Sequence, residues 1–444
     1  MGVVDSILRT DLNAFIEKCF YTLEPGAEYL DNWHIQEIVR NLQAVESGDV
    51  KRLVINMPPR YLKSLCVSVG WSAWLMGRNP ARKIIAASHT SSLSTKHSLD
   101  VRKIMQSEWY KKIFPGFDFA ADQNEKHKFM SKQFGFRLAT SVNGNITGEG
   151  ADIIIVDDPQ TPEQAFCKDA RANVLRWFDQ TLSTRLNNKK AGAIIVVAQR
   201  LHEDDLSGNL LKRGTWKHLC LPAVNDNGGL LHEEREGWDE IARVKADLGE
   251  YGFAAQYLQK PFRLDAGLVK PEWLKYYDVL PEGAVYQSWD TAIKTGANND
   301  YSVCITFVET AGGYYVADIF RDKLEYPELK RRMNLLAAKW NPVGILVEDK
   351  ASGQSLLQDL RRETKLLLLA QMPKGEKLQR LAAVTPMIEA GRLFLPKNAK
   401  LANMLELELC SFPDVEHDDM VDALTQFLNW SRNRNTQNMG IRRI

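Results

Sequence analysis

Short, continuously apolar segments in the first half constrain the fold of this chain most strongly. These segments are residues 53–55, 83–87, 152–156 and 193–198. Helical patterns over residues 64–75 and 91–113 lie between them. A strand that is apolar on both faces must be covered on both faces, and alternation with helices is typical of a parallel sheet. We therefore expect an α/β fold with a mostly parallel sheet in the N-terminal half.

A second pattern begins near residue 285. Its expected strands are residues 286–289, 303–308, 314–319 and 344–347, with Gly312-Gly313 as a hairpin turn, a helix over 327–340 and helices from 348 to the end. This order predicts a separate mixed α/β domain. The expected organisation is a first domain over 1–262, a linker over 263–284, a second domain over 285–432 and a basic tail over 433–444.

Charge and cysteine content limit the function classes. The 444 residues carry a net charge of +1, from 57 Lys+Arg against 56 Asp+Glu, so contact with nucleic acid would need local basic patches. The tail after residue 431 is one such patch, or simply a solvated end. The six cysteines form no CxxC pair, which disfavours structural zinc and disulfides. No apolar run approaches membrane-spanning length, so we expect a soluble, cytoplasmic protein.

Residues 56–64 join the first expected strand to a helix, which is the context of a phosphate-binding loop. Lys63 would reach the β and γ phosphates, and the Ser64 hydroxyl would hold Mg²⁺. Met57 and Leu62 occupy positions where the usual loop has glycine, and Lys63-Ser64 after a strand, taken alone, is more often an ordinary helix start. The candidate nucleotide-contacting residues are Met57, Pro58, Pro59, Arg60, Tyr61, Leu62, Lys63 and Ser64.

Acidic and polar residues follow the third and fourth apolar segments. Asp157-Asp158 ends the third, at the sheet edge where parallel strands bind ligands. Asp157 would hold Mg²⁺ through water and Asp158 would orient and deprotonate the attacking water; the alternative is that both acids only start a turn. Gln199 ends the fourth segment and would sense hydrolysis, beside acids at 203–205 that suit a helix N-cap.

A second group of carboxylates lies in the C-terminal half. Asp290 and Glu348 each end an expected strand, and Asp418, Asp419 and Asp422 open the last helix. Phosphodiester cleavage by in-line attack needs two Mg²⁺ or Mn²⁺ ions held by several carboxylates. Asp422 shares a helix face with Asp418 and Asp419, and the alternative reading is a capped helix start.

These motifs resemble the large terminase subunits of tailed bacteriophages, in particular the type whose phosphate loop contains Met-Pro-Pro-Arg. Residues 57–60 match that variant, with Lys63-Ser64 in register. Residues 148–159 are similar to its acidic-strand block, and 201–206 to its coupling region. The resemblance extends from about residue 33 to 428. Two departures are Leu62, in place of a glycine, and Asp158, where many relatives have glutamate.

The resemblance implies an N-terminal P-loop ATPase domain that uses ATP and Mg²⁺. Arg60 would stabilise charge in the transition state, or would hold the loop by pairing with an acid. Trp33, His34 and Gln36 resemble a segment that contacts adenine.

The resemblance also implies a C-terminal ribonuclease-H-like nuclease domain that binds two Mg²⁺ or Mn²⁺ ions. Asp290, Glu348 and Asp419 would be the primary ligands, with Asp418 or Asp422 as the auxiliary one. Lys294 would lie near the metals and neutralise the scissile phosphate; an exposed, salt-bridging lysine is the alternative.

The function expected from the resemblance is an ATP-driven motor that moves double-stranded viral DNA into a procapsid and an endonuclease that cuts concatemeric DNA. The implied partners are double-stranded DNA, a small terminase subunit and a portal protein, with a homo-oligomeric ring at the portal, a monomer in solution and no membrane. The expected place is the host bacterial cytoplasm and, transiently, the procapsid portal. The alternatives are a helicase-like or repair ATPase fused to a nuclease, and an inactive prophage remnant.

Overall fold

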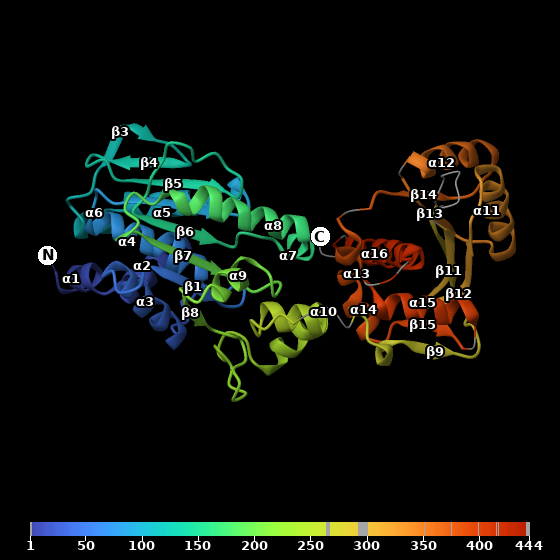
Figure 1. The fold of residues 1–444 in the computed structure, drawn as a ribbon. Helices are drawn as coiled ribbons and strands as arrows, with labels where there is room; N and C mark the ends of the chain where they lie inside the picture. The colour runs from blue at the N-terminus through green and yellow to red at the C-terminus, as the bar shows by residue number, and fades with distance from the viewer. Residues whose placement is uncertain are drawn as a thin grey trace. The chain divides into compact units, whose positions relative to one another are not determined.

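The chain divides into two compact units between Phe262 and Arg263, and each is described by itself. The computed structural model describes residues 2–262, 267–291, 301–349, 351–373, 375–397, 399–413, 415 and 417–440. Figure 1 labels the helices and strands of each unit. No helix among these residues is both long and apolar enough to cross a membrane.

The N-terminal unit is built on an eight-stranded sheet, in the order β3-β4-β5-β2-β6-β7-β1-β8. The strands are β1 (Arg52–Asn56), β2 (Lys83–Ser88), β3 (Phe119–Asn124), β4 (Lys128–Ser131), β5 (Phe136–Ser141), β6 (Ile153–Asp157), β7 (Ala193–Ala198) and β8 (Lys217–Cys220). The six strands from β5 to β8 in this order run parallel, and β3 and β4 add an antiparallel edge. The predicted parallel sheet is confirmed, and its β2, β6, β7 and β1 are the four apolar segments.

Helices cover both faces of this sheet, as the apolar strands require. The helical elements are α1 (Val3–Thr10), α2 (Leu12–Leu23), α3 (Trp33–Glu46), η1 (Leu65–Gly70), α4 (Trp71–Arg78), α5 (Ser91–Gln106), α6 (Glu108–Ile113), α7 (Pro162–Phe166), α8 (Lys168–Trp177), η2 (Phe178–Leu182), η3 (Ser183–Arg185), α9 (Leu206–Lys212) and α10 (Trp238–Gln256). One face packs on α1 to α6 and the other on α8, η2 and α9. Successive residues alternate between the faces: Ile153 and Ile155 join the first core, Ile154 the second.

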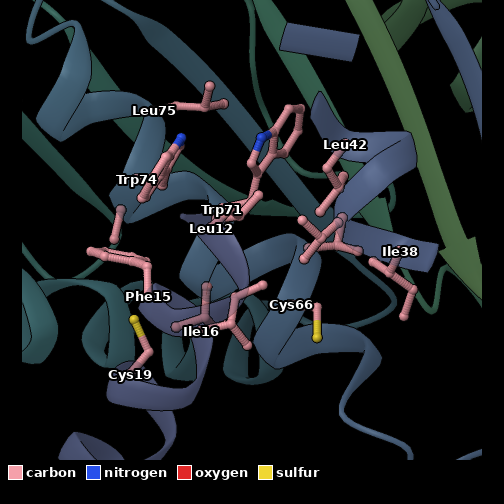
Figure 2. Packing of buried hydrophobic residues seen from close by; sticks show 14 of the residues in the cluster. Leu12, Phe15, Ile16, Cys19, Ile38, Leu42, Cys66, Trp71, Trp74 and Leu75 are labelled. Carbon is pink, nitrogen blue, oxygen red and sulfur yellow. The ribbon is translucent and has the colours of Figure 1, made fainter. Parts of the chain in front are cut away.

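The larger of these two cores is rich in aromatic side chains. Phe15 meets Trp74 edge to face, with ring centroids 5.2 Å apart. Figure 2 shows Phe15, Trp71 and Trp74 among aliphatic side chains of α2, α3 and α4. Cys66, two residues after Ser64, belongs to the same core. The segment that follows the phosphate loop is therefore anchored in a tightly packed core.

The C-terminal unit is built on a seven-stranded mixed sheet, in the order β14-β13-β10-β11-β12-β15-β9. The strands are β9 (Lys275–Tyr277), β10 (Ala284–Asp290), β11 (Ser302–Thr310), β12 (Gly313–Asp322), β13 (Gly344–Glu348), β14 (Leu368–Gln371) and β15 (Leu393–Pro396). The helical elements are η4 (Pro271–Trp273), α11 (Tyr326–Trp340), α12 (Ala351–Glu363), α13 (Lys377–Ala382), α14 (Thr385–Glu389), α15 (Lys400–Ser411) and α16 (Asp419–Gly440). The predicted antiparallel strands form β10-β11-β12, and the predicted fold class is confirmed.

The two faces of this sheet are covered differently. Residues of α11 and α12 pack with Trp289, Ile345 and Val347 on one face. On the other face α16 packs on β10 and β11, with Phe427 stacked on Phe307 at a centroid distance of 4.1 Å. The position of α16 decides where the acidic residues at its start lie.

Several elements differ from the expectations. The helix predicted over 91–113 is two helices, because the Ser107 hydroxyl caps a new start at α6. Strands β14 and β15 lie where only helices were expected. The segment expected as a linker contributes β9 to the second sheet, and its Leu268, Val269 and Leu274 are buried.

Candidate active sites

The phosphate loop and the acidic end of β6 meet at the carboxyl edge of the N-terminal sheet. The Nζ of Lys63 lies 2.8 Å from Oδ2 of Asp158, and the lysine side chain is almost fully buried. Burial alone would lower the pKa of Lys63, but the carboxylates of Asp158 and Asp157 raise it above its ordinary value. Lys63 is thus held as a charged group at the strand tip.

Asp157 is tied to the helix that follows the loop. Its Oδ1 accepts a hydrogen bond from the Ser64 hydroxyl at 3.1 Å, and its Oδ2 accepts one from the Ser68 hydroxyl at 2.5 Å. Burial raises the pKa of Asp157, against the opposing effects of Lys63 and the two serines. The hydroxyl and carboxylate predicted to share a magnesium ion are therefore already neighbours, and as oxygen donors they fit that cation.

The two carboxylate oxygens of Asp158 have different surroundings. Its Oδ2 meets Lys63, whereas its Oδ1 is buried without a hydrogen-bond partner among the described residues. A small cavity beside it is lined by Gln160 and Gln199 among others. Gln160 Nε2 and Gln199 Oε1 are also buried without partners in the described chain. The cavity thus gathers polar atoms that suit a bound water beside a carboxylate base. Gln160 was not predicted, since a glutamine in a turn carries no motif.

The loop contains no glycine, yet two of its residues have the left-handed backbone that glycine usually supplies. Arg60 and Leu62 both have positive φ, 70° and 63°. Met57 and Pro58 are buried, Pro59 is half-buried, and Arg60 is exposed and forms no ion pair with any described residue. Arg60 therefore remains open to a ligand, and nothing in the described chain supports its alternative role as a pairing residue.

The segment expected to contact adenine is split between two environments. Trp33 is exposed, whereas His34 is buried, with its Nε2 3.4 Å from the carbonyl oxygen of Tyr61. Burial lowers the pKa of His34 to about 4. His34 therefore contacts the phosphate loop itself.

The acids after β7 have structural roles. Asp205 accepts hydrogen bonds from Gly208, at the start of α9, and from the Arg200 guanidinium. The Asp204 carboxylate accepts a hydrogen bond from Lys212. The N-cap interpretation is thus correct for Asp205.

The second carboxylate group lies in the C-terminal unit. Asp290 and Glu348 end the neighbouring parallel strands β10 and β13, and Asp419 and Asp422 start α16. Burial raises the pKa of Asp290 well above its ordinary value, followed by repulsion from Asp422, Glu348 and Asp419. The fold therefore brings to Asp290 side chains that lie 58 to 132 residues further along the sequence.

Two basic side chains of α13 form ion pairs with the proposed auxiliary ligands Asp418 and Asp422. Lys377 Nζ lies 2.6 Å from Asp418 Oδ1 and 2.7 Å from Asp422 Oδ2, and Arg380 pairs with Asp422. These pairs offset the like charges at the start of α16. Lys377 and Arg380 were not predicted, because they lie about forty residues before their partners in a segment without a motif.

A further buried pair adjoins Asp419. The guanidinium of Arg321, at the end of β12, lies 3.7 Å from Glu408 and 3.9 Å from Asp419 and stacks over Tyr301. Burial raises the pKa of Glu408 to about 7, with Arg321 opposing the shift and Asp419 adding to it. Glu408 is thus an additional carboxyl group at this centre that the sequence did not reveal.

Carboxylate oxygens without thiolates suit a hard divalent cation. Among the described residues, however, no three acidic, histidine or cysteine side chains converge closely enough to hold a metal ion. The carboxylates are near enough to repel one another and would have to draw closer around an ion. Lys294 lies outside the described residues.

Comparisons with known proteins found one sequence match in the C-terminal unit and structural matches that cover most of the chain. The sequence model of the terminase RNaseH-like domain matches residues 287–430. A structure of the large terminase from a thermophilic bacteriophage is similar over 88% of this chain and 97% of its own, at 11% identity and a TM-score of 0.55.

A second structure of that phage terminase, in complex with ADP, is similar over 88% of this chain and 98% of its own, at 11% identity and a TM-score of 0.50. No curated protein sequence matches the chain. At this identity the structural likeness establishes the fold that both units share with these proteins.

Proposed function

We propose that this chain, whose C-terminal domain belongs to the terminase RNaseH-like family and whose fold is that of a phage large terminase, packages double-stranded DNA with ATP and cuts it with divalent metal ions. The observation that carries the proposal is the presence of two separate acid-containing centres. One pairs Lys63 with Asp157-Asp158 at a parallel sheet edge, and the other gathers Asp290, Glu348 and Asp419.

In the ATPase centre, Lys63 would move from Asp158 to the phosphates, and backbone N–H groups of the loop would face the same anion. Ser64 and Asp157 would hold the Mg²⁺ ion, which supplies charge neutralisation on the phosphate oxygens. Asp158 would accept the proton of the attacking water, which the neighbouring amides of Gln160 and Gln199 orient. Arg60, exposed beside Lys63, would stabilise developing charge.

In the nuclease centre, Asp290, Glu348 and Asp419 would hold two divalent ions, Mg²⁺ or Mn²⁺, which activate water and stabilise the leaving oxygen. Asp418 and Asp422 already pair with Lys377 and Arg380, so they would act by shaping the centre. Lys294 is proposed, by the resemblance alone, to neutralise the scissile phosphate.

The proposal also includes the expected partners, oligomeric state and location. A small terminase subunit and a portal protein are the proposed partners, with the chain forming a ring on the portal and acting in the host cytoplasm. No observation favours the helicase-like alternative. Displacement of a strand from a forked duplex would support that alternative instead.

The two centres allow a reciprocal test in the full chain. Lys63→Ala should lower ATP hydrolysis at least 100-fold and leave Mn²⁺-dependent plasmid cleavage unchanged, because the nuclease ligands lie in the other unit. Asp290→Ala should do the reverse. Survival of ATP hydrolysis in the first variant removes Lys63 from the site, and normal cleavage by the second removes Asp290.

A further inference from the structure

The phosphate loop contains strained backbone that its own sequence does not relieve. Arg60 and Leu62 lie in the left-handed region, where the Cβ atom of an L-residue comes too close to the following carbonyl oxygen. Glycine would adopt these angles without a penalty, but the loop has none. Such a conformation persists only where surrounding contacts impose it.

The residue between the two strained positions is firmly anchored. Tyr61 is 1% exposed, and its hydroxyl donates a hydrogen bond to Glu236 Oε2 at 2.8 Å. Its ring meets His34 edge to face at 5.9 Å, and the Arg235 guanidinium lies 5.7 Å from its centroid. The large side chain thus fixes the centre of the loop.

The other end of this contact is itself fixed. Glu236 closes a turn in which its N–H donates to the carbonyl of His232 at 3.0 Å. The preceding Leu231 is buried in the main core, and its carbonyl accepts a hydrogen bond from Asn32 at 2.7 Å. Residues 231–236 therefore form a rigid support, 175 residues along the chain from Tyr61.

We propose that Tyr61 and Glu236 are positioning residues that hold the glycine-free phosphate loop in its anion-binding shape. The inference rests on the proposed ATPase function; it adds Glu236 and changes the role of Tyr61 from a nucleotide contact to a support of the loop. Without the hydroxyl-to-carboxylate bond, Arg60 and Leu62 relax toward negative φ and the loop N–H groups turn away from the phosphates. Nucleotide affinity then falls, whereas the rate of hydrolysis at saturation changes less.

The test compares Tyr61→Phe and Glu236→Ala in the full chain, with Glu234→Ala as the matched control, since Glu234 is an exposed acid two residues away. The affinity for Mg·ADP should fall about tenfold in each of the first two variants and stay unchanged in the control. The double variant should be no weaker than either single one, because both remove the same bond. Glu236→Gln, whose amide oxygen can still accept from the hydroxyl, should restore most of the affinity.

A second measurement does not depend on nucleotide. Hydrogen–deuterium exchange at the amides of residues 57–66 in the nucleotide-free protein should be faster in Tyr61→Phe and Glu236→Ala, with plasmid cleavage unchanged. Unchanged exchange in both variants would overturn the anchor. If the wild-type protein bound no Mg·ADP, the proposed function would fail while the exchange result would still decide the anchor.

Discussion

Leu62 lies directly before the phosphate-loop lysine with a φ of 63°. Relatives that place glycine there need no compensation, whereas this chain carries a backbone cost and keeps a partly buried side chain that packs on the main core. The packing offsets part of the cost, because burying a leucine side chain contributes about 1.5–3 kcal/mol when complete. The departure from the family pattern therefore has little net effect on the fold.

Substitutions at this position should separate the two contributions. Leu62→Val should lower the free energy of unfolding by about 1–2 kcal/mol, because a β-branched residue is a strong outlier at positive φ. Leu62→Gly should stay within about 1 kcal/mol of the wild type, since relief of strain offsets lost packing. Urea unfolding followed by tryptophan fluorescence measures both, and a valine variant as stable as the wild type would contradict the strain.

Asp290 should be a source of instability when no metal is bound. A carboxyl whose folded pKa is raised favours its protonated form, so its ionisation costs stability as pH rises from the unfolded pKa toward the folded one. At pH 7 Asp290→Asn should therefore raise the melting temperature of the metal-free protein by several degrees. Mn²⁺ should stabilise the wild type and not the variant; equal stabilisation of both would place the ion elsewhere.

The sequence located the centres through residues that follow apolar strands. Lys63 was predicted from the loop between a strand and a helix, Asp157 from the carboxyl edge of a parallel sheet, and Asp290 from the end of a strand together with the resemblance. Glu408 and Arg321 were not, because they come from the middle of a helix and the end of an antiparallel strand. Only the packing of α15 and β12 against the start of α16 brings them together. Residue roles inside each centre remain predictions from the resemblance.

At the scale of elements, α16 is the part on which the proposed nuclease centre depends. The amide of Gln426 donates hydrogen bonds to the Ser288 hydroxyl at 3.0 Å and to the Trp289 carbonyl at 3.2 Å. These bonds join the helix to the strand that ends in Asp290. They set the position of Asp419 and Asp422 along the axis of the helix.

Loss of these two hydrogen bonds should displace the acidic side chains of α16 without unfolding the C-terminal unit. Gln426→Ala should cost about 1–2 kcal/mol of stability and reduce Mn²⁺-dependent cleavage about tenfold, because the acids of α16 shift relative to Asp290. Asn433→Ala, at an exposed position of the same helix, is the control and should change neither. Full cleavage by Gln426→Ala would show that packing of Phe427 alone positions the helix.

Which strands could be predicted follows from how continuously apolar their sequences are. Strands β1, β2, β6 and β7 have apolar runs and were predicted. Strand β5 is buried but was missed, because it contains Arg137 and Thr140, and β3 and β8 were missed because they are partly or mostly exposed and polar. The short strand β14, with an exposed residue, was likewise missed. Edge strands form because they hydrogen-bond to the backbone of a neighbouring strand, and the local sequence pattern does not reveal that pairing.

At the scale of the whole molecule, residues 267–277 belong structurally to the C-terminal unit. Leu268, Val269 and Leu274 are buried in it, and β9 pairs with β15. A Cβ on Gly267 would lie 1.9 Å from the carbonyl oxygen of Cys410, so the chain passes close against α15 there. The stretch between the units is accordingly shorter than its loop-like sequence indicated.

Two fragments that begin at different residues should show how much residues 267–277 contribute to the stability of the C-terminal unit. The fragment 284–444 should be about 3–5 kcal/mol less stable than 263–444, because it loses three buried apolar side chains and a strand. Thermal unfolding of the two fragments measures the difference. Equal stability would mean that the segment merely rests on the surface.

The pairing of Lys377 and Arg380 with the acids of α16 has a consequence for the order of assembly. Two of the gathered negative charges are neutralised by the chain's own cations, so folding of this region does not require a bound metal ion. Uptake of the proposed divalent ions would then be a late and reversible event, and the proposed nuclease would stay inactive until they bind.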